Sequence, residues 1–168
     1  MICETEKRLL PGAACAVLFV HGILGSPAQF APFLPLVPQD WSFCNLLLQG
    51  HGGGARDFSA ASMAVWREQT RQAFAELRAR HETVVIAAHS MGTLFAVQEA
   101  VRSPVEGLFL LNVPLHVHVR PRALHNAWLN YGGTPRDPWG QAAVAAYGVE
   151  RDRNVLHYAG WPPRFFEL

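Results

Sequence analysis

A serine at position 90 has the sequence context that nucleophilic catalysis requires. The stretch 84–93, VVIAAHSMGT, predicts an apolar strand, a sharp turn that carries Ser90 and the first turn of a helix. In such a nucleophile elbow the serine projects from the carboxyl edge of a parallel sheet, and the residues two before and two after it must be small. Ala88 and Gly92 occupy these positions. If this stretch is considered alone, Ser90 could instead be a buried serine that only caps a helix.

Acyl transfer through a serine also needs a base and two N–H donors for the developing oxyanion. One donor would be the backbone N–H of Met91, where the start of a helix adds its positive dipole end. The second would be the backbone N–H of Ile23, in the loop that follows the first central strand. Gly22, in the same loop, would allow the backbone to turn toward the site.

The elements that position these residues alternate along the first two thirds of the chain. Apolar runs at 14–20, 42–48, 84–88 and 106–111 predict strands, and residues 1–12 predict one edge strand at most. Helices are expected from Ser26 and Pro27 to a point before Pro35, from Ser62 over about five turns, and from the elbow to about Val101. This order predicts an α/β fold, in which a parallel sheet carries helices on both faces.

Beyond residue 112 the pattern changes to frequent proline and aromatic residues without further strands. We therefore expect two regions, a core over 1–112 and a helical cap or lid over 113–168. Short helices are expected around 122–130, 138–147 and 151–158. The rings of Trp128 and Trp161 would line a substrate pocket beneath this cap, and ordinary core packing is the alternative for them.

Bulk composition restricts the classes of partner. The 168 residues suit one domain, half of them are apolar, 16% are charged and the net charge is +1, which disfavours nucleic-acid binding. Three cysteines without C-x-x-C spacing favour a reducing compartment. Neither a leader sequence nor a membrane span is indicated, so a cytoplasmic protein is expected. The His116-x-His118 spacing lacks accompanying ligands, so neither a metal nor a cofactor is expected.

Three motifs together resemble a known family. The segments HGILGSP at 21–27, QGHG at 49–52 and AHSMG at 88–92 resemble the successive signatures of the α/β-hydrolase fold, within its carboxylesterase and monoacylglycerol-lipase-like branch. The resemblance covers about residues 14–112. It implies an esterase or lipase that acts on a small apolar acyl ester, with Ser90 as nucleophile and Ile23 and Met91 as oxyanion donors. His21, Gly22 and His89 are then assigned to the substrate pocket.

The resemblance also implies two further strands that carry the acid and the histidine of a catalytic triad, and no segment here is similar to them. The best substitute pair within the chain is Asp152 with His157. We expect the chain to be the N-terminal part of a longer hydrolase, or to be completed by a second, C-terminal chain. The alternative is a non-catalytic binding module in which the apolar strand 106–111 pairs edge to edge in a homodimer. A nucleotide site is disfavoured because the glycines at 50–54 lack the required spacing.

Overall fold

The computed structural model describes residues 4–116, 148–150 and 154–166 of the chain. Their elements follow the order β1 (Glu6–Arg8), β2 (Cys15–Val20), η1 (Pro27–Gln29), η2 (Leu34–Leu36), β3 (Ser42–Leu46), β4 (Gly53–Gly54), α1 (Ala55–Ala60), α2 (Met63–Arg78), β5 (Thr83–His89), α3 (Met91–Arg102), β6 (Gly107–Leu111), β7 (Val149–Glu150), η3 (Val155–Tyr158) and α6 (Trp161–Phe166). The three elements named η are short 3₁₀ helices.

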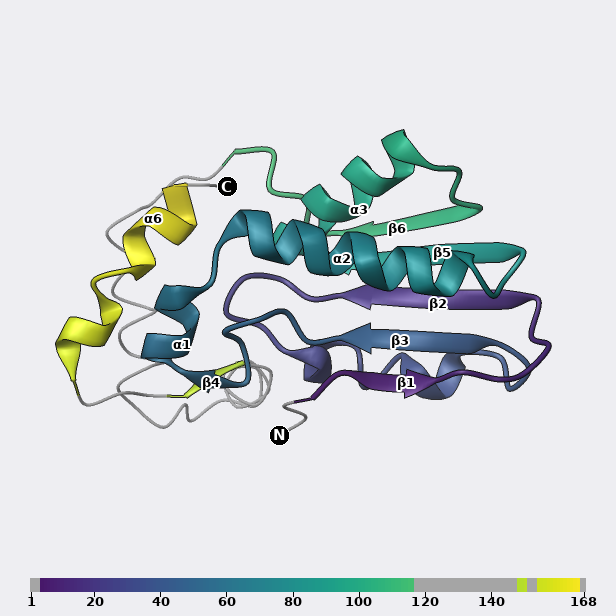
Figure 1. Cartoon of the computed structure of the whole chain (residues 1–168), viewed down its shortest axis with the longest axis horizontal. Coiled ribbons are helices and arrows are strands. Elements are labelled where there is room, and N and C mark those ends of the chain that lie inside the picture. Colours follow the sequence, from purple (N-terminus) through teal and green to yellow (C-terminus); the bar gives the residue numbers. More distant parts are fainter. Residues whose placement is uncertain (1–3, 117–147, 151–153, 167–168) are drawn as a thin grey trace.

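Five of the strands form one sheet in the order β1-β3-β2-β5-β6. All pairs in it are parallel except β1 with β3, so the carboxyl ends of β2, β3, β5 and β6 meet at one edge (Figure 1). Elements α1, β4 and α6 lie beyond this edge (Figure 1). The predicted α/β class, a mostly parallel sheet with helices, is confirmed.

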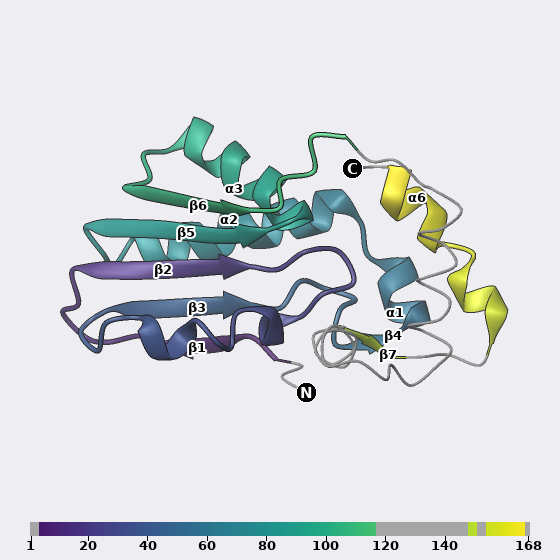
Figure 2. The same cartoon turned by 180° about the vertical axis from the view of Figure 1, so that it is seen from behind.

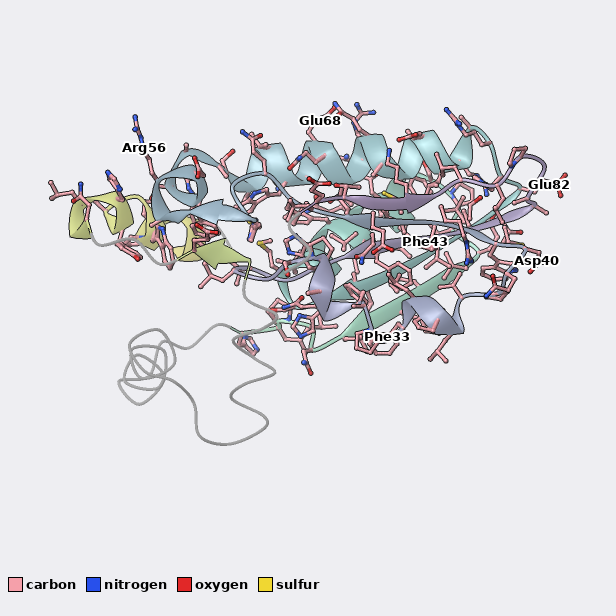
Figure 3. The ribbon with its side chains drawn as sticks, turned by 90° about the horizontal axis from the view of Figure 1, so that it is seen from below. Phe33, Asp40, Phe43, Arg56, Glu68 and Glu82 are labelled. Carbon is pink, nitrogen blue, oxygen red and sulfur yellow. The ribbon has the colours of Figure 1, made fainter. Side chains whose placement is uncertain are left out.

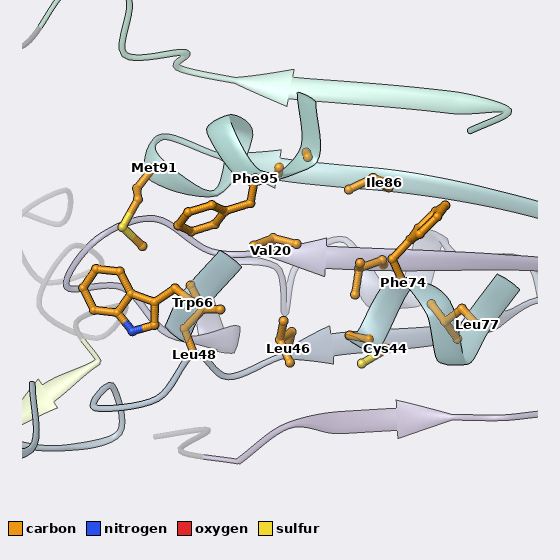
Figure 4. Packing of buried hydrophobic residues seen from close by; sticks show 14 of the residues in the cluster. Val20, Cys44, Leu46, Leu48, Trp66, Phe74, Leu77, Ile86, Met91 and Phe95 are labelled. Atoms are coloured by element: carbon orange, nitrogen blue, oxygen red, sulfur yellow. The ribbon is translucent and has the colours of Figure 1, made fainter. Parts of the chain in front are cut away.

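The two long helices cover the same face of the sheet. Side chains of α2 and α3 pack with the inward residues of β2, β3 and β5 into the larger apolar cluster (Figure 4). Trp66, Phe95 and Ile86 are among its fully buried members. Helix α2 begins at the expected cap, because the Ser62 hydroxyl accepts a hydrogen bond from the N–H of Val65 (3.3 Å).

The opposite face is covered differently from the expectation. Seen from behind, it carries η1 and η2, while α2 and α3 lie on the far side (Figure 2). The smaller cluster on this face contains Phe19, Phe43 and Phe30. The α-helix expected from Ser26 and Pro27 to a point before Pro35 is wrong, because Pro32 lies inside this range, lacks the N–H that an α-helix needs and clashes with the preceding turn. Two 3₁₀ turns replace it.

A second group of elements packs beside the carboxyl edge. Strand β7 pairs with β4 in parallel, and η3 and α6 contact α1. The helices expected around 122–130 and 138–147 lie outside the described residues, whereas η3 coincides with the end of the helix expected over 151–158. The division into a core over 1–112 and a cap over 113–168 stays a prediction.

Candidate active site

Ser90 occupies a strained turn between β5 and α3. Its φ is 49° and its ψ is −121°, a backbone conformation that residues other than glycine rarely adopt. The Ser90 N–H donates to the carbonyl of Leu111 (2.8 Å), and the hydroxyl of Thr93 donates to the carbonyl of Ser90 (2.6 Å). These bonds hold the turn at the carboxyl end of the central strand β5, where the predicted elbow should be.

Glycine is required on both sides of this turn. A Cβ at Gly92 would lie 2.7 Å from the carbonyl oxygen of His21 and closer still to that of Val20. A Cβ at Gly22 would lie 3.0 Å from the Cβ of Ser90. Helix α3 therefore approaches the end of β2, and the loop after β2 approaches Ser90, at distances that leave no room for an unstrained Cβ.

Backbone strain is concentrated at this edge. Among the described residues, the non-glycine residues with positive φ are Leu24, Ser90 and Asn112. They follow β2, β5 and β6 respectively, the strands whose carboxyl ends meet around the elbow. Strained residues of this kind cluster at functional sites, because the surrounding structure must hold them in place.

Two backbone N–H groups are available beside Ser90. The N–H of Ile23 has no acceptor among the described residues, whereas the N–H of the preceding Gly22 donates to Oε1 of Gln29 (3.1 Å). Met91 is the first residue of α3, where N–H groups have no partner within the helix. Gln29 thus fixes the orientation of the loop that presents Ile23.

Two buried histidines hold this loop against the glycine-rich loop. Nε2 of His21 accepts the N–H of Leu48 (3.1 Å), and Nε2 of His51 accepts the N–H of Leu24 (3.1 Å). The two rings meet edge to face, 4.7 Å apart. Burial lowers the pKa of His21 to about 4, and it lowers the pKa of His51 well below its ordinary value. Both rings are therefore neutral and structural, and His21 is buried under the site instead of lining an open pocket.

His89 and Asn112 form a pair next to the elbow. The Nδ2 of Asn112 lies 3.1 Å from Nε2 of His89, while Nδ1 of His89 is buried without a hydrogen-bond partner. Burial also lowers the pKa of His89. With Phe30, Phe33, Gln29 and Leu111, His89 lines a pocket of about 300 Å³. His89 thus lies at the wall of a pocket, and its Nε2 is engaged by the amide of Asn112. Its role in substrate binding stays a prediction.

We expect Asn112→Ala to destabilise the fold more than Asn112→Gly, although both lose the contact with His89. The φ of Asn112 is 54°, and alanine in this region costs roughly 1–2 kcal/mol that glycine avoids. The free energy of unfolding in urea measures the difference. Equal stabilities of the two variants would show that the side chain alone matters at this position.

The aromatic and acidic residues assigned to the site from the cap are only partly described. The indole of Trp161 donates to the carbonyl of Ala55 (3.1 Å) and its ring packs on Phe58, so it contacts α1. The backbone carbonyl of His157 accepts the hydroxyl of Ser59 (2.5 Å), and its Nε2 lies 3.2 Å from Nδ2 of Asn154. No described interaction joins His157 to Ser90. Trp128 and Asp152 lie outside the described residues.

Sequence reasoning missed three contributors to this edge. Gln29 binds the loop from η1, Asn112 binds His89, and Gly148 donates its N–H to the carbonyl of Leu24 (2.8 Å). Asn112 carried a usable signal, because asparagine directly after a strand tolerates a positive φ. Gln29 and Gly148 carried none, because their partners are backbone groups that no sequence pattern associates with them.

Among the described residues, no three or more His, Cys, Asp and Glu side chains gather so that they could hold a metal ion. No helix in this part of the chain is long and apolar enough to cross a membrane.

The strand order, the strained serine turn and the two glycine contacts are features of an α/β-hydrolase fold. The model of the alpha/beta hydrolase family matches residues 17–168, and the chain belongs to this family. The resemblance of the three motifs to the α/β-hydrolase fold is thereby confirmed, whereas the carboxylesterase and monoacylglycerol-lipase-like branch stays a prediction. No curated protein matches the sequence.

Solved structures support the same fold. A structure of the metagenome-derived lipolytic enzymes LipS and LipT has a TM-score of 0.61 at 23% identity, with 81% of this chain and 54% of that chain covered. The structure of the monoacylglycerol lipase of Paleococcus ferrophilus has a TM-score of 0.55 at 18% identity, with 77% of this chain and 51% of that chain covered. The structure of the bottromycin epimerase BotH has a TM-score of 0.60 at 21% identity, with 96% of this chain and 68% of that chain covered. The chain therefore spans about half the length of the two lipolytic proteins.

Proposed function

We propose that this chain carries the nucleophile and the oxyanion donors of a serine hydrolase that cleaves small, apolar acyl esters. The observation that carries the proposal is the strained turn at Ser90. The hydroxyl oxygen of Ser90 would attack the acyl carbon, and the N–H groups of Ile23 and Met91 would donate to the oxyanion. The bond to the alkoxy oxygen then breaks, and water hydrolyses the acyl-enzyme.

The proton of Ser90 must reach the leaving alcohol through a base. His89 is the nearest imidazole in sequence, but its Nε2 lies against Asn112 and its pKa is lowered by burial. His157 with Asp152 is the substitute pair proposed from the sequence. A second, C-terminal chain is the other proposed source, because the two lipolytic structures are about twice as long as the part that matches.

The test is covalent labelling with a fluorophosphonate, which reacts with activated serines. We expect mass spectrometry to locate the label on the peptide that contains Ser90. Ser90→Ala should abolish it, whereas Ser103→Ala, at the other end of α3, should retain it. A well-folded protein that no fluorophosphonate labels would contradict the proposal.

A binding function without turnover is the second candidate. It is favoured by the absence of any described imidazole or carboxylate partner for the Ser90 side chain. In that case acyl ligands would raise the melting temperature, while nitrophenyl esters would be hydrolysed no faster than in buffer. Labelling of Ser90 together with ester turnover would exclude it.

A further inference from the structure

The loop after β2 contains a backbone N–H without an acceptor among the described residues, and it belongs to Ile23. Its neighbours on both sides are hydrogen-bonded. The N–H of Gly22 donates to Oε1 of Gln29 (3.1 Å), and the N–H of Leu24 donates to Nε2 of His51 (3.1 Å). Two side chains thus bind the backbone on either side of one free donor.

These two side chains reach the loop from opposite faces of the sheet. Gln29 is the last residue of η1, which lies on the face opposite α2. The ring of His51 lies against Trp66 of α2, 5.2 Å from ring centre to ring centre. Figure 3 shows the two faces, with Phe33 on the side of η1 and η2 and Glu68, on α2, on the other. The loop is therefore bound from both faces.

The bond from Gln29 acts on the residue that sets the direction of the free N–H. The N–H of Ile23 belongs to the same planar peptide as the carbonyl of Gly22, so the φ and ψ of Gly22 decide where it points. Glycine allows more values of these angles than any other residue. The Gly22 carbonyl accepts the N–H of Gly25 (3.0 Å) and lies 2.9 Å from Nδ1 of His21. Since Gln29 binds its N–H, both polar groups of Gly22 are fixed.

The loop leaves space for the amide of Gln29. A Cβ at Gly25 would lie 2.5 Å from Nε2 and 2.8 Å from Cδ of Gln29, so the amide lies directly against this glycine. A side chain at position 25 would therefore displace the amide, although the residue at position 29 would be unchanged. Two different substitutions can thus remove the same bond to Gly22.

We propose that Gln29 is a positioning residue for the oxyanion, because its amide holds Gly22 so that the N–H of Ile23 is oriented before the substrate binds. This role rests on the proposed serine hydrolase function. A donor that is preorganised in this way stabilises the developing charge without reorganisation during the reaction. Gln29 acts through the backbone and not by contact with the reacting atoms. Loss of its bond should therefore slow the covalent step and leave ground-state binding almost unchanged.

Fluorophosphonate labelling of Gln29→Met and Gly25→Ala tests this role. Methionine keeps the length of the side chain and removes the acceptor, whereas alanine at position 25 displaces the amide. In the reaction the Ser90 oxygen bonds to phosphorus, fluoride leaves and the hydroxyl proton passes to the buffer, while the phosphoryl oxygen takes the place of the oxyanion. Each variant should lower the maximal labelling rate about tenfold or more. The reagent concentration that gives half of this rate should change little.

Gln69→Met is the matched control. The Oε1 of Gln69 accepts the N–H of Gln49 (2.8 Å), so this side chain also binds the backbone of a loop that follows a strand. That loop carries no proposed oxyanion donor, and we expect the variant to be labelled at the wild-type rate. Urea unfolding of every variant verifies that slow labelling does not result from a loss of stability.

Amide hydrogen exchange followed by NMR tests the same bonds without a reaction. In the wild type the N–H groups of Gly22 and Leu24 should exchange slowly and that of Ile23 fast. Gln29→Met should accelerate exchange at Gly22 and leave Leu24, which His51 binds, almost unchanged. Slow exchange at Gly22 in Gln29→Met would show that the amide does not hold this residue, and the proposal would be wrong.

The two measurements separate failure of this role from failure of the proposed function. If the wild type is labelled and Gln29→Met is labelled equally fast, the positioning role alone is wrong. A variant that keeps the maximal rate but needs more reagent would make Gln29 a binding residue, which also overturns the proposal. If the folded wild type is not labelled at all, the serine hydrolase function fails and the role of Gln29 fails with it.

Discussion

Gly92→Val should lower the free energy of unfolding by about 3 kcal/mol or more, a large share of the stability of a domain of this size. Any Cβ at this position meets the backbone carbonyls of Val20 and His21, which cannot rotate away as a side chain would. Helix α3 would have to move off β2, and this movement also separates Ser90 from the loop that presents Ile23. Urea unfolding measures the loss, and fluorophosphonate labelling of Ser90 should fall with it.

Gly54→Ala provides the matched control for this substitution. Gly54 has a φ of −82°, and a Cβ there would meet only Oδ2 of Asp57, at an ordinary 3.9 Å. We expect its stability to stay within about 0.5 kcal/mol of the wild type. If Gly92→Val were as stable as Gly54→Ala, the close approach of α3 to β2 would be wrong.

Acid should destabilise the protein between about pH 6.5 and pH 4 through His21. The unfolded chain binds a proton near pH 6.5, whereas the buried native ring does so only at about pH 4. Within this window the unfolded state therefore holds more protons, so stability is complete above pH 6.5 and falls as the pH falls. This difference between the unfolded and native pKa of His21 corresponds to about 3 kcal/mol in the free energy of unfolding. The lowered pKa of His51 acts in the same direction.

His21→Asn separates this contribution from that of the carboxylates. The variant should be less stable at pH 8, because the acceptor for the N–H of Leu48 is altered, but its stability should fall less between pH 6.5 and 4. The groups that face His21 are the imidazoles of His51 and His89, with no carboxylate among them. Urea unfolding measures the free energy of unfolding of both proteins as a function of pH. If the two curves ran parallel, the conclusion that His21 is buried in its neutral form would be wrong.

The parts of the fold that were predictable from the sequence depend on local patterns. Continuous apolar runs gave the strands, with bounds that shifted by one or two residues, and Ser62 gave the start of α2. The elbow was predictable because a strand, a small residue, a serine and a glycine follow one another within ten positions. The prediction of an α-helix after Ser26 failed because a good N-cap was given more weight than Pro32, which lies inside the expected range.

The contacts that complete the site could not be predicted in the same way. His21 and His51 were assigned roles from their positions on loops, but the pKa of His51 depends on burial beside Trp66 and Phe58, which come from other elements. The amide of Asn112 reaches His89 only because β6 lies beside β5 in the sheet. Such pairings are products of the tertiary structure.

The bond between Gly148 and Leu24 has a consequence for the order in which the protein forms during synthesis. Gly148 donates to the carbonyl of Leu24, and its own carbonyl accepts the N–H of Gly52. Strands β2, β3, β5 and β6 are complete once residue 111 has been made. The loop beside Ser90, in contrast, acquires these backbone partners only after residue 148 has left the ribosome. The sheet can therefore fold before the loops at its carboxyl edge are fixed, and the nascent chain has a folded core before the surroundings of Ser90 are complete.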